Sequence, residues 1–227
     1  MVACTTVATT WNLLTNDEFR VAISLRLGLP IVQPHVCRCG DKVNRNGHHG
    51  LSCQKASGTL PRHAVCNNIL QRALKSAEVP AVLEPLGCSR PDGKRPDGMS
   101  LIPWERGRSL LWDYTCGDTF APSYLNSSSK HIGYVAERAE REKISDYSNL
   151  ANHFVFIPVA TETSGVFGKL GMDLIKKIGS KIADATNEKR ATSYLIQRIS
   201  IAIQKGNVAS ILGTIPPGKD LNEIFFL

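Results

Sequence analysis

The most constraining feature of this sequence is a repeated turn, because the tetrapeptide Arg-Pro-Asp-Gly occurs at residues 90–93 and again at 95–98. Proline presets the backbone of a turn, aspartate hydrogen-bonds to the chain that follows, and glycine tolerates a positive φ. We expect the first copy to form the tip of a hairpin and the second to lead into a strand over 99–104. Asp97 then lies beside a sheet, whereas Asp92 is a turn residue.

A second aspartate, Asp113, lies within a short apolar run that predicts the next strand, over residues 108–115. Because side chains alternate along a strand, its two faces are Leu110-Trp112-Tyr114 and Leu111-Asp113-Thr115. A carboxylate in a strand that is buried on at least one face needs a partner, often a metal. Carboxylates on neighbouring strands predict a site for Mg²⁺ or Mn²⁺, which can activate water at a scissile phosphate.

The composition is that of a globular protein with a basic surface. Its 227 residues suffice for one sizeable domain, or for a domain with a small appended module. A net charge of +7 suits a polyanionic partner such as DNA. No run approaches the ~18 apolar residues of a membrane span, and the start lacks the regions of a signal peptide. We expect a nuclear or otherwise intracellular protein that is neither secreted nor inserted in a membrane.

Three of the seven cysteines cluster with two histidines between residues 37 and 53. An odd number of cysteines without an export signal favours reduced thiols. Cys37, Cys39 and Cys53, with His48 or His49 as the fourth ligand, predict a closed tetrahedral zinc site with a structural role. His49, four residues before Cys53, is slightly preferred. The alternative is a set of redox-inert thiols beside solvated histidines.

The remaining pattern predicts an α/β fold with a mixed central sheet flanked by helices. Helices are expected over 16–27, 62–77, 128–149, 168–186 and 189–205, and further strands over 81–84 and 153–163. The chain divides into an N-terminal arm (1–36), a zinc knuckle and link (37–60), a core (61–186) and a C-terminal helix and tail (187–227).

A lysine interrupts the apolar stripe of the helix expected over 128–149. That stripe runs through Ile132, Val135 or Ala136, Ala139, Lys143 and Tyr147. Lysine is unusual on an inward face. Beside two metal-binding aspartates, Lys143 could orient the attacking water or meet the charge of the phosphate. The alternative is a lysine that extends from the helix shoulder into solvent.

Three further residues are candidates for the same site. Glu84 and Glu162 stand at strand ends, where an outer metal ligand and an ordinary edge carboxylate are both compatible with the pattern. His63, near the start of its helix, could contact the site or a phosphate, or could cap the helix locally.

The order helix, three strands, helix, strand, with acids on the second and third strands, is the core plan of the PD-(D/E)XK, or restriction-endonuclease-like, nucleases. More closely, the chain resembles the restriction-like endonuclease region at the carboxyl end of site-specific non-LTR retrotransposon proteins. That family combines a Cys-Cys-His-Cys knuckle, an Arg-His pair, a Lys/Arg-Pro-Asp, a second Asp and a Lys displaced onto the following helix. The matching residues, within 37–163, are Cys37, Cys39, His48 or His49, Cys53, Arg62-His63, Arg95-Pro96-Asp97, Asp113 and Lys143, with Tyr147 one turn on.

The resemblance implies a Mg²⁺- or Mn²⁺-dependent DNA endonuclease stabilised by zinc. Asp97 and Asp113 would bind the catalytic metal and Lys143 would help to position the water. The residues expected to contact DNA, or RNA, are Arg62, His63, Arg95 and Tyr147. In the parent element the partner is a reverse transcriptase domain.

Two departures from the family keep other functions open. Thr115 replaces the usual Lys of the third strand, and no reverse transcriptase precedes the knuckle, so we expect a fragment or a stand-alone derivative. The alternatives are an inactive nucleic-acid-binding remnant with a structural zinc site, and a zinc-stabilised protein-interaction domain.

Overall fold

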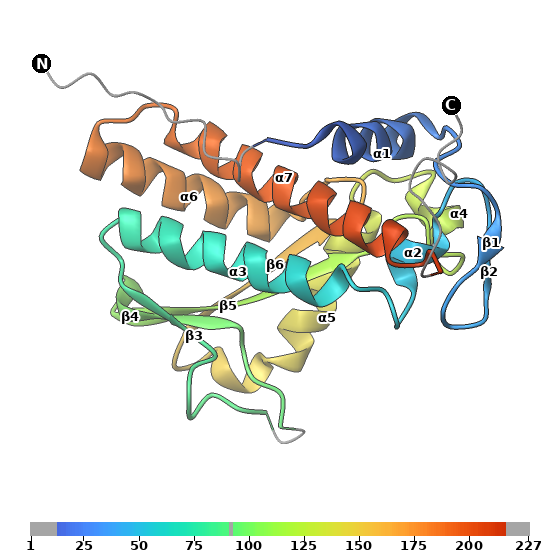
Figure 1. Cartoon of the computed structure of the whole chain (residues 1–227). Helices are drawn as coiled ribbons and strands as arrows, with labels where there is room; N and C mark the ends of the chain where they lie inside the picture. Colours follow the sequence, from blue (N-terminus) through green and yellow to red (C-terminus); the bar gives the residue numbers. More distant parts are fainter. Residues whose placement is uncertain (1–12, 91–92, 217–227) are drawn as a thin grey trace, which may run out of the picture.

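A mixed four-stranded sheet lies at the centre of the computed structural model, which describes residues 13–90 and 93–216 (Figure 1). In the order β3-β4-β5-β6, the first two pairs are antiparallel and the last is parallel. The strands are β3 (Ala81–Leu83), β4 (Gly98–Glu105), β5 (Arg108–Gly117) and β6 (Val155–Glu162). The expected mixed sheet is confirmed. Pro91 and Asp92, at the expected hairpin tip, lie outside the described residues.

Helices cover both faces of this sheet (Figure 1). One face packs against α3 (Thr59–Ser76), α6 (Lys169–Thr186) and α7 (Ala191–Leu212), and the opposite face is covered by α5 (Tyr134–Asp146). Leu110, Trp112 and Tyr114 of β5 belong to the core beneath the three helices, as the alternation predicts. Within the described residues, we find no helix with the length and apolarity that crossing a membrane requires.

A second, smaller core joins segments that the sequence analysis separates. It combines residues of α1 (Asn16–Leu27), of the segments that flank β1 (His35–Val36), of β2 (Lys42–Val43) and of α2 (His49–Ser52) with the end of α7. Val21 of α1 and Ile211 of α7 are both fully buried there. Because α7 contributes to both cores, it joins the described parts of the arm and the knuckle to the helices that cover the sheet.

The helix expected over 128–149 is instead two helices, α4 (Leu125–Ser128) and α5. Gly133 separates them, because its φ of +83° suits glycine and interrupts a right-handed helix. The expected stripe therefore fails at Ile132, which is 88% exposed, whereas Val135, Ala136 and Tyr147 are buried. Two other bounds also moved: α3 begins at Thr59 and α7 continues to Leu212.

Two buried glutamates hold the starts of α5 and α6. Glu162 accepts hydrogen bonds from the backbone N–H groups of Val135 (3.0 Å) and Ala136 (3.3 Å). Glu140 of α5 accepts from the N–H groups of Leu170 (3.1 Å) and Gly171 (2.8 Å). Carboxylates satisfy the unpaired donors at helix N-termini and interact favourably with the helix dipole. These contacts fix α5 between β6 and α6, and so determine where the side chains of α5 reach.

We predict that Gly98→Ala destabilises the fold, because a methyl group at this position would lie 2.0 Å from ring carbon Cζ2 of Trp112. Overpacking of this kind costs about 1–3 kcal/mol of unfolding free energy. Urea unfolding measures the effect, with Leu101→Ala as the control because Leu101 lies on the same strand and is 56% exposed. Equal stability of Gly98→Ala and the wild type would contradict this packing.

Candidate metal centre and candidate active site

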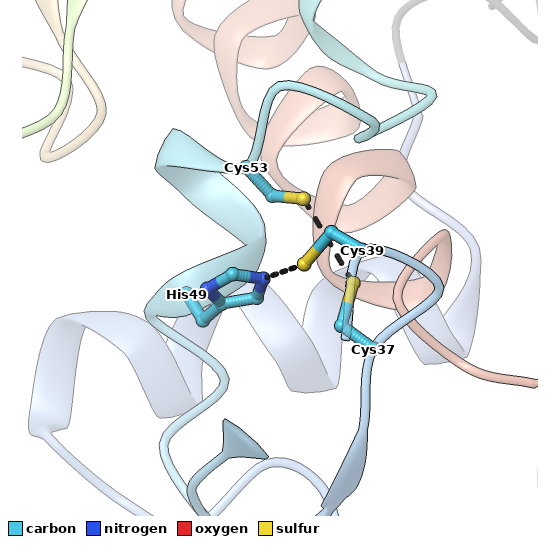
Figure 2. Close-up of side chains that lie close together, drawn as sticks. All are labelled: Cys37, Cys39, His49 and Cys53. Carbon is cyan, nitrogen blue, oxygen red and sulfur yellow. Dashed lines mark hydrogen bonds between the residues drawn. The ribbon is translucent and has the colours of Figure 1, made fainter. Parts of the chain in front are cut away.

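Three thiols and one imidazole converge in the knuckle (Figure 2). The ligand atoms of Cys37, Cys39, His49 and Cys53 all lie within 4.8 Å of one another. The Sγ atoms of Cys37 and Cys53 are 3.8 Å apart, and Cys39 Sγ is 3.2 Å from His49 Nε2. Three soft sulfurs with one imidazole nitrogen form a donor set that suits tetrahedral zinc. The cluster can therefore bind a metal such as zinc.

Asp41 supports this cluster from the loop between the first two ligands and the histidine. Its Oδ2 lies 3.6 Å from Cys39 Sγ and 3.9 Å from His49 Nδ1, so a carboxylate faces the outer nitrogen of the imidazole. The backbone of Asp41 favours the Cys39 thiolate, but burial and the neighbouring thiols of Cys37 and Cys53 outweigh it and raise the pKa of Cys39 to about 11. A divalent cation removes this competition between thiolates, so metal binding should release protons.

His48 does not join the cluster, which resolves the alternative between the two histidines. Its ring stacks on Phe120 with centroids 4.3 Å apart and an interplanar angle of 14°. Burial lowers the pKa of His48, against the opposing effect of Asp118. Adjacent residues at the start of a short helix point in different directions, and here only His49 points toward the thiols.

We predict that His49→Ala removes the bound metal, whereas His48→Ala retains it. His49 supplies the single nitrogen of the cluster, while His48 contributes only an aromatic contact. Zinc content per chain and the d–d absorption of the Co²⁺-substituted protein measure the difference. The opposite result, with metal lost only in His48→Ala, would contradict the assignment.

The register of the sheet brings the two predicted aspartates to the same end of the β4–β5 pair. Gly98 of β4 pairs with Trp112 of β5, and one residue further along the two chains stand Asp97 and Asp113. Asp97 directly precedes β4, so the paired register ends at Gly98 and Asp97 reaches β5 through its side chain. Asp97 also accepts a hydrogen bond from the backbone N–H of Tyr114, at 2.6 Å. Its charge contributes to raising the pKa of Asp113, so the two carboxyl groups interact.

Lys143 and Tyr147 of the α5 layer reach Asp113. Lys143 Nζ lies 2.8 Å from Asp113 Oδ1, and the hydroxyl of Tyr147 is a further neighbour that favours the ionised carboxylate and so lowers its pKa. Asp113 is only 4% exposed, and this desolvation raises its pKa although Lys143 opposes the shift. Desolvation and the Asp113 charge likewise raise the pKa of Tyr147. Lys143 therefore balances the charge of this buried carboxylate, and a divalent cation at Asp113 would share it with the ammonium.

His63 of α3 approaches Asp97 from the opposite helical layer. Its Nε2 lies 3.0 Å from Asp97 Oδ2, and this hydrogen bond raises the pKa of His63 against the effect of burial. Its Nδ1 lies 3.3 Å from the amide nitrogen of Asn67, whose Oδ1 accepts from Trp112 Nε1 at 2.9 Å. The site thus connects Asp97 to both layers of the fold.

Two residues expected to contact DNA are interior instead, which corrects the expectation for Arg62 and Tyr147. Arg62 is 3% exposed, packs against Gly206 and donates to Asn207 Oδ1 at 2.8 Å. Tyr147 is 1% exposed and packs on Phe156, with ring centroids 4.7 Å apart. Neither side chain is accessible to a nucleic-acid backbone in this conformation.

Glu84 and Arg95 are at the surface and pair with each other. The backbone N–H of Glu84 also donates to the carbonyl of Asp97, at 2.8 Å, so this pair borders the site. Glu162 lies elsewhere: it pairs with Gly117, four residues along β5 from Asp113, or roughly 13 Å at 3.3 Å per residue. Because Glu162 caps α5, we leave it out of the candidate active site.

Asn67 and Asp41 were not singled out in the sequence. Asn67 stands four residues after His63, on the same face of α3, so a polar residue in an otherwise apolar stripe was the available signal. Asp41 lies between the knuckle ligands, where a carboxylate commonly supports a metal-binding histidine.

In the comparisons with known proteins, neither a family model nor a curated protein matches this chain.

Proposed function

We propose that the chain is a metal-dependent DNA endonuclease with a restriction-endonuclease-like core, derived from a retrotransposon protein. The observation that carries the proposal is that Asp97 and Asp113 flank the Gly98–Trp112 pair at the start of β4, with Lys143 2.8 Å from the Asp113 carboxylate. The element order around the mixed sheet also supports it. On this proposal the zinc knuckle has a structural role.

The acid pair suits a hard divalent cation. Both hydrogen bonds that the Asp97 carboxylate accepts fall on Oδ2, and among the described residues none falls on Oδ1. Asp113 offers a desolvated carboxylate across the strand pair. When bound there, Mg²⁺ or Mn²⁺ would supply an activated water and stabilise charge on the phosphate.

The protein's own groups would complete the chemistry. Asp97 and Asp113 would hold the metal, while Lys143, which is part-exposed beside them, would orient the water or balance the negative charge of the pentacovalent phosphate. Arg95, exposed at the border of the site, and the +7 net charge favour a nucleic-acid backbone over a neutral substrate. DNA in the nucleus, and a reverse transcriptase domain as partner in the parent element, follow from the same proposal.

The experiment is nicking of supercoiled plasmid in Mg²⁺, with EDTA as the negative control. We predict that Asp97→Asn and Asp113→Asn abolish nicking while leaving DNA binding nearly intact, because each removes a metal ligand without adding negative charge. Nicking by Asp97→Asn at the wild-type rate would exclude this pair as the metal site.

We further predict that Lys143→Ala lowers the nicking rate by about 10²-fold while sparing DNA affinity, the typical effect of removing one electrostatic group from an active site. Lys130→Ala is the matched control, because Lys130 is exposed beyond the end of α4. DNA binding without nicking in the wild type would favour the second candidate, a catalytically inactive nucleic-acid-binding remnant. The replacement of the usual Lys by Thr115 and the intact Cys/His cluster are consistent with that candidate.

A further inference from the structure

A chain of three hydrogen bonds fixes which nitrogen of His63 carries the proton. Trp112 Nε1–H can only donate, so the oxygen of Asn67, 2.9 Å away, must be the acceptor. The amide nitrogen of Asn67 then faces His63 Nδ1 at 3.3 Å and donates to it. In the neutral imidazole Nδ1 is therefore the acceptor, which places the single proton on Nε2. That proton points at Asp97 Oδ2, 3.0 Å away.

Trp112 and Asn67, the first two members of this series of hydrogen bonds, are held rigidly by the core. Trp112 is 1% exposed and Asn67 is 4% exposed, so neither side chain has room to turn. The Trp112 ring lies against Gly98, where the missing Cβ leaves the space that the ring occupies. Gly98 directly follows Asp97, so the Trp112 ring packs on the backbone beside the Asp97 carboxylate. The same ring orients the amide of Asn67, which in turn orients His63.

This series of hydrogen bonds also determines which oxygen of the Asp97 carboxylate is left for a cation. Oδ2 receives two donors, His63 Nε2–H and the N–H of Tyr114 at 2.6 Å. In the part of the chain that the structure describes, Oδ1 receives none, so it is the oxygen left for a cation. A donor that saturates one carboxylate oxygen restricts rotation of the group, which is how supporting residues improve metal affinity.

We propose that His63 is a positioning residue for the metal site: held in its Nε2–H form by Asn67 and Trp112, it orients Asp97 for a divalent cation. This role differs from contact with DNA and rests on the proposed function. It makes a specific demand on chemistry at residue 63: one donor toward Asp97 and one acceptor toward Asn67. Glutamine meets both demands through its amide, whereas alanine meets neither.

The first experiment is long-range ¹H–¹⁵N NMR of His63 in the zinc-loaded, otherwise metal-free protein. We expect the Nε2–H form in the wild type. Asn67→Asp still accepts from Trp112 but presents an oxygen to Nδ1, so we expect it to place a proton on Nδ1. A wild-type spectrum with the proton on Nδ1 would overturn the proposal, whether or not the protein cleaves DNA.

The second experiment measures Mn²⁺ affinity of the zinc-loaded protein by electron paramagnetic resonance, together with the Mg²⁺ concentration that gives half-maximal nicking. His63→Ala should weaken both by about 10-fold or more, the usual effect of losing a residue that supports a metal ligand. His63→Gln should restore most of the loss, and the rate at saturating Mg²⁺ should change less than the affinity.

The outcomes separate the two claims. If the wild type binds Mn²⁺ at the acid pair and His63→Ala binds it equally well, positioning by His63 is excluded and the proposed function stands. If Asp97→Asn and the wild type bind Mn²⁺ equally weakly, the metal site itself is excluded, and the positioning role falls with it. A loss in His63→Ala that His63→Gln does not restore would also overturn the proposal.

Discussion

The register between β4 and β5 is the constraint on which the candidate active site depends. Gly98 lies opposite Trp112, and this close approach is possible because residue 98 has no Cβ. Asp97 directly precedes Gly98 and Asp113 directly follows Trp112, so the same register brings the two aspartates to the same end of the strand pair. A slip of one residue would turn every side chain of a strand to the other face and separate the two carboxylates. The packing of one glycine under one tryptophan therefore helps to set the geometry of the acid pair.

The burial of Asp113 creates a second requirement, which α5 meets. A carboxylate that is 4% exposed is costly unless it is paired, and Lys143 with Tyr147 provides the partners. These residues reach Asp113 because Glu162 holds the start of α5 while Glu140, within α5, holds the start of α6. Two glutamates that serve as caps thus help to position the partners of a third carboxylate, Asp113. Glu162 and Glu140 accept hydrogen bonds from backbone N–H groups at helix starts, whereas Asp113 is paired with the side chain of Lys143.

Much of the fold was predictable because its signals are local. Turn chemistry located the strands, and strand alternation placed Trp112 and Asp113 on opposite faces, as the structure confirms. The knuckle ligands followed from spacing, but the preference for His49 over His48 was slight, because the direction of adjacent side chains depends on the stacking of His48 on Phe120. Sequence spacing cannot show such a contact across the fold.

The errors arose where tertiary contacts override local pattern. Arg62 looked like a surface cation, yet Asn207 and Gly206, far along the chain, form a buried cradle for it. Ile132 fitted a helical stripe, but it lies before Gly133, the positive-φ N-cap at which α5 begins. The Asn67–His63 contact was visible only as an i, i+4 spacing, and its meaning depends on Trp112 from a different element.

The most direct test of this account is a crystal structure of the zinc-loaded protein soaked in Mn²⁺, with anomalous scattering recorded at the manganese and zinc edges. The account predicts a manganese peak about 2.1–2.2 Å from one oxygen of Asp97 and one of Asp113. A zinc peak among Cys37, Cys39, His49 and Cys53 serves as the internal control. Zinc in the knuckle without manganese between the two aspartates would contradict the proposed catalytic site.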